Sequence, residues 1–334
     1  MGGQSMERFG GVGIVMIAGL LNAAFAIPMR YNRHWKWENT WLVFSFWSLL
    51  VFPWLFVVLL VAHAGELFGS LTFRELAPAL VFGFLWGVAQ ATFGISIKLL
   101  GVSIAIPVVS AIAIILGAFI PLLARHPEAL AGRLGLSLML SSLFLIAGLV
   151  VYARASRMRE KGSIEKTSRA GLLLAIFTGI VGGALNIGFG LSEGIVNRSE
   201  AMGNGARAST YPVWAVLLAA GFVPNFIYCL YMTRKNKTWL LFTAEGFAPD
   251  LLRSVLMAVF WILATTLYGV STTYMGKFGS SVGYLLYGSF TILFANILGW
   301  KAGEWAGASS QSQKTFWAGM GLVLAGVGSL GLLP

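Results

Sequence analysis

The sequence predicts an all-α membrane protein with ten transmembrane helices, and three observations lead to that fold class. Of its 334 residues, 57% are hydrophobic and only 10% are charged, whereas soluble globular chains carry charge on roughly 25% of their residues. The apolar residues also form runs of about 18 or more, the length that crosses a hydrocarbon core of about 30 Å. No run alternates apolar and polar residues as the strands of a membrane β-barrel do. The spans are therefore expected to be helices surrounded by lipid.

Ten apolar runs can be delimited along the chain, with boundaries good to a few residues. They are 11–29, 40–62, 76–98, 102–124, 134–154, 169–191, 211–233, 251–275, 279–300 and 315–333.

The basic residues indicate how the chain is oriented. Sixteen Lys and Arg lie in the loops after spans 1, 3, 5, 7 and 9, against seven in the alternate loops and the N-terminal segment. Because Lys and Arg concentrate on the cytoplasmic side, both termini are predicted outside a bacterial-type inner membrane. The net charge of +11 is explained by these short loops, so no nucleic-acid partner is expected.

The second half of the chain resembles the first. In spans 3 and 8, four residues match at a spacing of 175, with Phe93 opposite Tyr268; the four pairs are Trp86 and Trp261, Gly94 and Gly269, Ser96 and Ser271, and Gly101 and Gly276. Spans 2 and 7 each carry one proline, Pro53 and Pro224, and spans 5 and 10 share similar stretches at 146–148 and 324–326. An internal repeat of this kind determines the architecture.

Each repeat has five spans, an odd number, so the second copy must enter the membrane in the opposite orientation. The predicted organisation is a first repeat at 1–155, a charged cytoplasmic linker at 156–168 and a second repeat at 169–334. Inverted repeats are the usual construction of secondary transporters, because two similar halves can expose a central site alternately to each side.

Polar side chains deep in the spans are the candidate site residues, since a polar group at mid-membrane is costly unless it is paired or solvated. Asn22 and Asn186 occupy the first spans of the two repeats, and others lie in spans 3, 8 and 9. Each of them alone is more simply explained by an interhelical hydrogen bond, but together they favour a polar cavity. The expected substrate-binding residues are Asn22, Trp86, Gln90, Phe93, Asn186, Trp261, Tyr268, Tyr284 and Tyr287.

The mixture of residue types in this set suggests the kind of solute. Amides and hydroxyls alternate with aromatic rings on the same spans, a combination that suits a sugar, whose hydroxyls need hydrogen bonds and whose C–H face packs on a ring. A small polar solute is therefore the expected partner, together with the lipid bilayer.

The group that couples transport to an ion is harder to identify, because every acid lies in a loop or near a span end. The acids closest to spans are Glu38, Glu193 and Glu304, and Lys98 ends span 3. These four are the coupling candidates, and proton coupling stays open.

Enzymatic chemistry finds no support in the sequence. The three histidines, His34, His63 and His126, have no metal-ligand spacing, and no phosphate-binding P-loop is present. We expect no cofactor, no metal and no catalytic residue.

At this point the sequence resembles a known family, the bacterial L-rhamnose/proton symporters of the drug/metabolite transporter superfamily. The stretch from Pro28 through 35–38 to Pro53-Trp54 looks like that family's first loop and second span. Further matches lie in and after span 3 and in the Glu304-Trp305 pair; in span 3 and its following turn they are Gly83, Trp86, Gly87, Gly94, Lys98, Gly101 and Ser103. The resemblance implies ten spans, a sugar-type substrate and proton coupling. In span 9 the chain departs from the family, reading Gly283-Tyr284-Leu285 where the family pattern has an aspartate.

The function expected from these observations is secondary active transport of a monosaccharide, rhamnose-like, or a related polar metabolite by alternating access. Two alternatives remain: an exporter of amino acids or drug-like metabolites of the same superfamily, and a membrane receptor or assembly subunit that does not transport.

Overall fold

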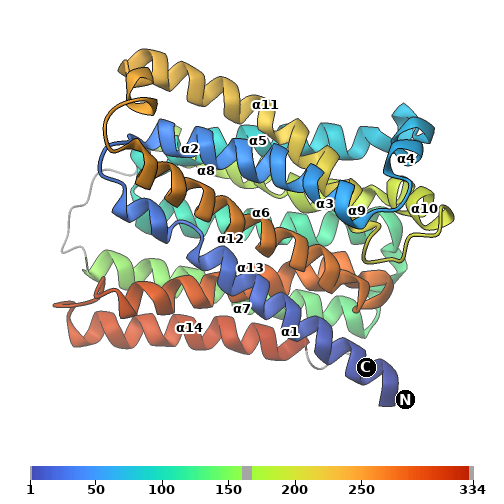
Figure 1. Cartoon of the computed structure of the whole chain (residues 1–334). Coiled ribbons are helices and arrows are strands. Elements are labelled where there is room, and N and C mark those ends of the chain that lie inside the picture. Colours follow the sequence, from blue (N-terminus) through green and yellow to red (C-terminus); the bar gives the residue numbers. More distant parts are fainter. Residues whose placement is uncertain (1, 160–167, 331–334) are drawn as a thin grey trace.

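The structure is a computed structural model that describes residues 2–159 and 168–330, and within these ranges every regular element is helical (Figure 1). The elements of the first half are α1 (Gly2–Ala24), η1 (Ile27–Tyr31), α2 (Trp37–Ser45), η2 (Phe46–Val51), α3 (Phe52–Leu60), α4 (Ala64–Ser70), α5 (Phe73–Leu100), α6 (Val102–Arg125), η3 (Pro127–Ala131) and α7 (Arg133–Arg159). Those of the second half are α8 (Arg169–Gly182), α9 (Ala184–Leu191), α10 (Glu193–Ala201), α11 (Thr210–Asn236), η4 (Trp239–Phe242), α12 (Phe247–Thr273), η5 (Gly276–Phe278), α13 (Gly279–Lys301) and α14 (Ser310–Leu330).

Nine helices in the described part of the chain are long and apolar enough to cross a membrane, and they coincide with the first nine predicted spans. They are Phe9–Tyr31, Trp37–Leu60, Phe73–Leu100, Val102–Arg125, Arg133–Arg159, Arg169–Ala201, Thr210–Asn236, Phe247–Thr273 and Gly276–Lys301. The all-α membrane fold is thus confirmed. Helix α14 overlaps the tenth predicted span but does not belong to these nine. Of the predicted linker 156–168, residues up to Arg159 continue α7, and 160–167 lie outside the described residues.

Two spans are interrupted along their length. Span 2 changes from α2 through the π-helical turn η2 to α3 just before Pro53, whose ring nitrogen has no hydrogen to donate. Span 6 breaks at Gly183 between α8 and α9. Discontinuous helices are a feature of transporter binding sites because they bring backbone polar groups to the membrane interior.

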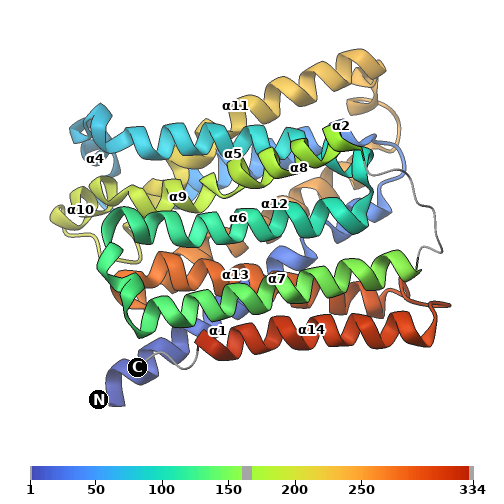
Figure 2. The same cartoon turned by 180° about the vertical axis from the view of Figure 1, so that it is seen from behind.

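The first helix of each half of the chain packs on two helices of the other half. Helix α1 packs on α12 and α13, while α8 packs on α5 and α6. Helix α11 packs on α5, where a side chain on Gly83 or Gly87 would collide with the backbone carbonyls of Leu217 or Gly221. Helices α7 and α14 form a pair at one side of the bundle (Figures 1 and 2).

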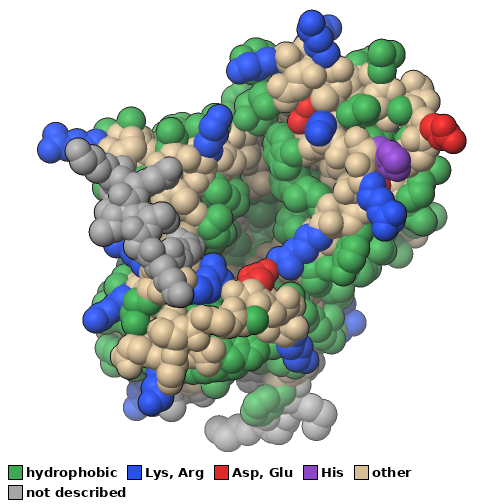
Figure 3. All heavy atoms as spheres, turned by 90° about the vertical axis from the view of Figure 1, so that its left-hand side faces the viewer, with side chains coloured by type: hydrophobic (Ala, Val, Ile, Leu, Met, Phe, Trp, Pro, Cys, Tyr) green, Lys and Arg blue, Asp and Glu red, His purple; other side chains and the backbone are tan. Residues whose placement is uncertain are grey.

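The bundle has two ends, which we name for what they carry. The linker end, at the left of Figure 1, holds the end of α7 and the beginning of α8; the terminal end, at the right, holds the beginning of α1 and the end of α14. Seen from the linker end, the molecule has a hollow at its centre (Figure 3). Hydrophobic side chains line the hollow, and basic side chains surround its rim.

Candidate functional site

Asn186 is the centre of a buried polar cluster. It lies in α9 just after the helix break, and its side chain is 0% exposed. Its Nδ2 donates to the carbonyl oxygens of Gly117 (2.8 Å) and Ser280 (3.0 Å), and its Oδ1 accepts a hydrogen bond from the Tyr268 hydroxyl. The Tyr268 hydroxyl is also 3.1 Å from the Ser280 carbonyl. One amide thus joins α6, α9, α12 and α13 and has both of its N–H groups engaged.

Aromatic rings surround this polar cluster. The Tyr268 ring stacks on Tyr287 with centroids 5.1 Å apart, and Tyr284 lies 5.7 Å away. On its other side, Phe189 stacks on Trp214 at 4.4 Å, and both rings contact Tyr268. We call Asn186, Tyr268, Tyr284, Tyr287 and Ser280 the polar node. All these residues are neutral, so the node offers hydrogen bonds and ring faces but no fixed charge.

Small residues let the rings come this close to the helices. The Tyr284 ring lies against Gly117, where any side chain would overlap it. In the same way, the indole nitrogen of Trp214 lies over Gly269. Both glycines are therefore required by the aromatic packing.

A second aromatic contact joins the two halves. Trp86 of α5 and Trp261 of α12, which the sequence repeat pairs, stack with centroids 5.6 Å apart and an interplanar angle of 21°. Phe44 meets Trp261 edge-on, and Gly221 gives room to the Trp86 ring. Both tryptophans are buried, so they lie at the interface between the halves rather than at the membrane surface.

Three of the predicted residues lie apart from both the node and the tryptophan pair. The Nδ2 of Asn22 donates to Thr291 Oγ1 at 3.2 Å, linking α1 to α13. Gln90 is half-buried and, in the described part of the chain, its amide has no hydrogen-bond partner. Phe93 packs in a separate apolar cluster with the residues Leu100, Ala105, Val109 and Ala175. The structure therefore does not bring Phe93 to Trp86 or to the node.

Of the coupling candidates, Glu38 is the buried one. It is 3% exposed at the beginning of α2, and its Oε1 accepts hydrogen bonds from Asn236 Nδ2 and Thr238 Oγ1, both at 2.9 Å. Neutral groups thus hold this carboxyl between span 2 and the end of α11. Lys98 is exposed near the end of α5.

Glu193 and Glu304 form ion pairs at opposite ends of the bundle, and each pair joins the two halves of the chain. At the terminal end, Glu193 pairs with Arg125. At the linker end, Glu304 pairs with Arg30 at 2.6 Å, and the pair is largely exposed. Each of these two acids therefore links the first half of the chain to the second through an ion pair.

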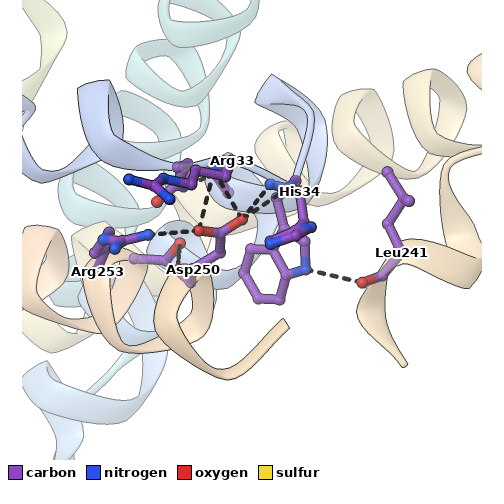
Figure 4. A network of polar contacts seen from close by, with 9 residues as sticks. Arg33, His34, Leu241, Asp250 and Arg253 are labelled. Atoms are coloured by element: carbon purple, nitrogen blue, oxygen red, sulfur yellow. Dashed lines mark hydrogen bonds and ion pairs between the residues drawn. The ribbon is translucent and has the colours of Figure 1, made fainter. Parts of the chain in front are cut away.

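A buried carboxylate that the sequence did not single out is Asp250, in the first turn of α12. It is 0% exposed, and it accepts hydrogen bonds from the backbone N–H groups of 33–35 at 2.8 to 3.2 Å and from Arg253 at 2.8 Å (Figure 4). The Trp35 indole donates to the Leu241 carbonyl beside it. Asp250 thus fixes the loop after span 1 to span 8, and its complete set of partners indicates a structural role.

Trp214 is the other residue that sequence reasoning missed. It is 0% exposed beside the node, and among the described residues its indole N–H has no acceptor. A buried donor without a partner is costly, and here it lies against the rings of Phe189 and Tyr268. The signal in the sequence was weak, because Trp214 falls near the beginning of its span, where an interfacial tryptophan is common.

Comparison with known proteins identifies the family of the chain. The sequence profile of the L-rhamnose-proton symport protein family matches residues 9–332. An L-rhamnose-proton symporter of Cronobacter sakazakii is 24% identical over 321 residues, covering 93% of each chain. One of Yersinia pestis is 24% identical over 294 residues, covering 85% of this chain and 86% of the relative. The family is one of transporters, not of enzymes, and this multi-pass membrane protein belongs to the L-rhamnose-proton symport protein family.

Proposed function

We propose that the protein is a secondary active transporter that moves a rhamnose-like monosaccharide across the inner membrane together with protons. The observation that carries this proposal is the polar node, where a buried amide and three tyrosines meet beside stacked aromatic rings. The L-rhamnose-proton symporters that the chain resembles support the sugar and the proton. Neither the exporter nor the receptor alternative is favoured by these relatives.

The chemistry of the node fits a neutral polyol. A charged substrate transferred to this depth would need an opposite charge beside it, and the residues of the node are all neutral. Tyrosine hydroxyls both donate and accept hydrogen bonds, as the hydroxyls of a sugar do. The Trp86–Trp261 stack adds an apolar surface against which the C–H face of a sugar ring can pack.

The architecture that we propose is ten spans in two inverted repeats, 1–155 and 169–334, with α14 as the tenth span. The exchange of packing partners supports it: α1 lies on α12 and α13 as α8 lies on α5 and α6. If spans 1 to 5 correspond to spans 6 to 10, each of these contacts is the counterpart of another. The stacking of Trp86 on Trp261, residues 175 apart that match in the repeat, is the contact expected at the axis between the halves.

In the alternating-access cycle that we propose, this structure corresponds to a state that is open at the linker end. The hollow opens at the linker end (Figure 3), whereas the Arg125–Glu193 pair lies at the other end. Gly117, which accepts from Asn186, is eight residues before Arg125 on α6, or about 12 Å along the helix. The node and this ion pair would together close the terminal end. The excess of basic residues in the loops after spans 1, 3, 5, 7 and 9 supports a cytoplasmic linker end with both termini outside.

For proton coupling we propose Glu38. Among the four candidates it alone is buried, and its hydrogen-bond partners are neutral. Glu193 and Glu304, by contrast, are paired with arginines.

Transport by purified protein in liposomes tests the proposal. Labelled L-rhamnose should accumulate when the outside is made acidic, and preloaded unlabelled rhamnose should drive counterflow without a proton gradient. Glu38→Gln, which keeps the shape of the side chain, should lose the gradient-driven accumulation but retain counterflow. Glu200→Gln, at an exposed position, is the control and should keep both.

The possible outcomes separate the alternatives. Rhamnose binding without counterflow would identify a receptor, and efflux of amino acids without sugar uptake would identify an exporter. Full gradient-driven accumulation by Glu38→Gln would exclude Glu38 as the coupling group while leaving sugar transport in place.

A further inference from the structure

A large apolar groove lies between α6 and α7, away from the polar node. Its volume is about 770 Å³, and all its lining residues belong to these two helices. On α6 the lining follows one helical stripe, with Ile104 and Pro107 near one end and Leu116 at the other; on α7 it runs from Ile146 to Arg157. The lining is apolar except for two arginines.

The groove faces outward from the bundle. The opposite side of α6 carries Gly117, which meets Tyr284 of α13, so α6 separates the groove from the node. Helices α6 and α7 run side by side in the view of Figure 2. In a membrane, this side of the helix pair borders the lipid.

The two arginines lie together at the linker end of the groove. Arg154 and Arg157 are in the last two turns of α7, and both are exposed. Within the described ranges neither guanidinium forms an ion pair. Beside them, Ser156 Oγ lies 3.0 Å from Ser103 Oγ at the beginning of α6, which holds the two helices together at this end.

The depth of the groove matches one leaflet of a bilayer. From Ile104 to Leu116 the lining spans thirteen residues of α6, or twelve steps of the helix, about 18 Å at the helical rise. Half of a hydrocarbon core is about 15 Å. An acyl chain that begins at the level of the arginines would therefore fill the groove from the membrane surface to near its midplane.

We propose that the α6/α7 groove binds an anionic phospholipid, with an acyl chain against the apolar lining and the phosphate between Arg154 and Arg157. Basic pockets between transmembrane helices at the cytoplasmic surface suit acidic headgroups, and a guanidinium binds phosphate through two parallel hydrogen bonds. A zwitterionic lipid fills the same apolar space but brings a cationic group to the arginines, so charge complementarity selects the anionic lipid.

Native mass spectrometry of the full-length protein tests this proposal. The protein, purified in detergent, is mixed with equal amounts of phosphatidylglycerol and phosphatidylcholine that carry identical acyl chains. Each basic residue near an anionic headgroup contributes roughly a fivefold preference, so with two arginines phosphatidylglycerol should be retained roughly 25-fold over phosphatidylcholine. Arg154→Gln/Arg157→Gln should reduce that ratio to near one.

Two further variants make the test specific. Arg74→Gln/Arg133→Gln removes the same charge from exposed positions near the beginnings of α5 and α7 and should keep the preference. Ala111→Phe fills the groove from α6 and should lower phosphatidylglycerol retention with both arginines present. Thermal unfolding checks that each variant is folded.

Three results would overturn the proposal. They are a wild-type ratio near one, an unchanged ratio in Arg154→Gln/Arg157→Gln, and displacement of the lipid by free glycerol 3-phosphate, which would mean that the groove contributes nothing. If native mass spectrometry shows the wild-type protein as a dimer, and Ala111→Phe dissociates it while lipid retention is unchanged, the groove binds a second copy of the chain instead.

Discussion

Corresponding residues in the two halves of the molecule have very different surroundings. Tyr268 and Phe93 match in the sequence repeat, yet Tyr268 is buried in the polar node while Phe93 packs in an apolar cluster between α5, α6 and α8. Asn186 and Asn22 occupy the first spans of the two halves, but Asn186 makes three hydrogen bonds and Asn22 one. Similar spans can thus carry unequal chemistry, and every residue of the polar node comes from the second half.

The first half nevertheless contributes to the node through its backbone. The Gly117 carbonyl on α6 is one of the two acceptors of the Asn186 amide. A backbone acceptor on one half and a side-chain donor on the other make the hydrogen bond depend on how the halves are docked. If the halves rock against each other, this bond is one that must break and form again.

Replacing the two asparagines should give the largest contrast. Asn186→Ala removes all three hydrogen bonds of this amide. The Tyr268 hydroxyl keeps only the Ser280 carbonyl, and the Gly117 carbonyl loses its side-chain donor, at about 1–3 kcal/mol for an unsatisfied buried group. The variant should abolish rhamnose uptake. Asn22→Ala removes one half-buried bond of about 0.6 kcal/mol and should retain most uptake. Initial uptake rates and thermal unfolding midpoints of both variants measure the difference. An equal loss in the two variants would mean that the halves contribute alike.

Exchanging the side chains of the matching residues Tyr268 and Phe93 should have an intermediate effect on uptake. Tyr268→Phe keeps the ring stack on Tyr287 but removes the hydroxyl that Asn186 Oδ1 accepts from, and uptake should fall about tenfold, the equivalent of roughly 1.4 kcal/mol. Phe93→Tyr places a hydroxyl in an apolar cluster, so it should lower stability by about 1–3 kcal/mol with little change in the transport rate. The measurements are the uptake rate at several rhamnose concentrations and the unfolding midpoint. Recovery of uptake in the double variant would contradict the assignment, because it would show that either half can supply the hydroxyl.

How much of this could be predicted from sequence depends on the kind of signal. The spans were predictable because each is a long apolar run, and the observed helices cover the first nine. Asn186 and Tyr268 were recognisable because polar groups deep in a span are conspicuous. Asp250 was not, since its partners are backbone N–H groups more than 200 residues earlier in the chain, and backbone groups leave no mark in a sequence.

Phe93 shows a different limit of sequence reasoning. It is seven residues after Trp86 and lies on nearly the same face of the helix, which made the two appear to share a cavity. Seven residues also separate them by about 10 Å along the axis. Over that distance the neighbours of α5 change: Trp86 meets Trp261, whereas Phe93 meets the apolar cluster that includes Ala175 of α8. Periodicity gives the direction of a side chain but not the element that faces it.

Substitutions in the tryptophan stack should affect rhamnose binding equally in the two halves, and their effect should be the smallest of the three. Trp86 and Trp261 stack on each other, so each indole loses the same contact when the other is shortened. Trp86→Phe and Trp261→Phe should each weaken rhamnose binding by about 2- to 12-fold, since an aromatic pair contributes about 0.5–1.5 kcal/mol. Concentration-dependent uptake gives the half-saturation constants, and the double variant should show less than the sum of the two single effects, because both remove one contact. Strongly unequal single effects would mean that the sugar contacts one indole only, and the asymmetry seen at Tyr268 and Phe93 would then extend to the interface between the halves.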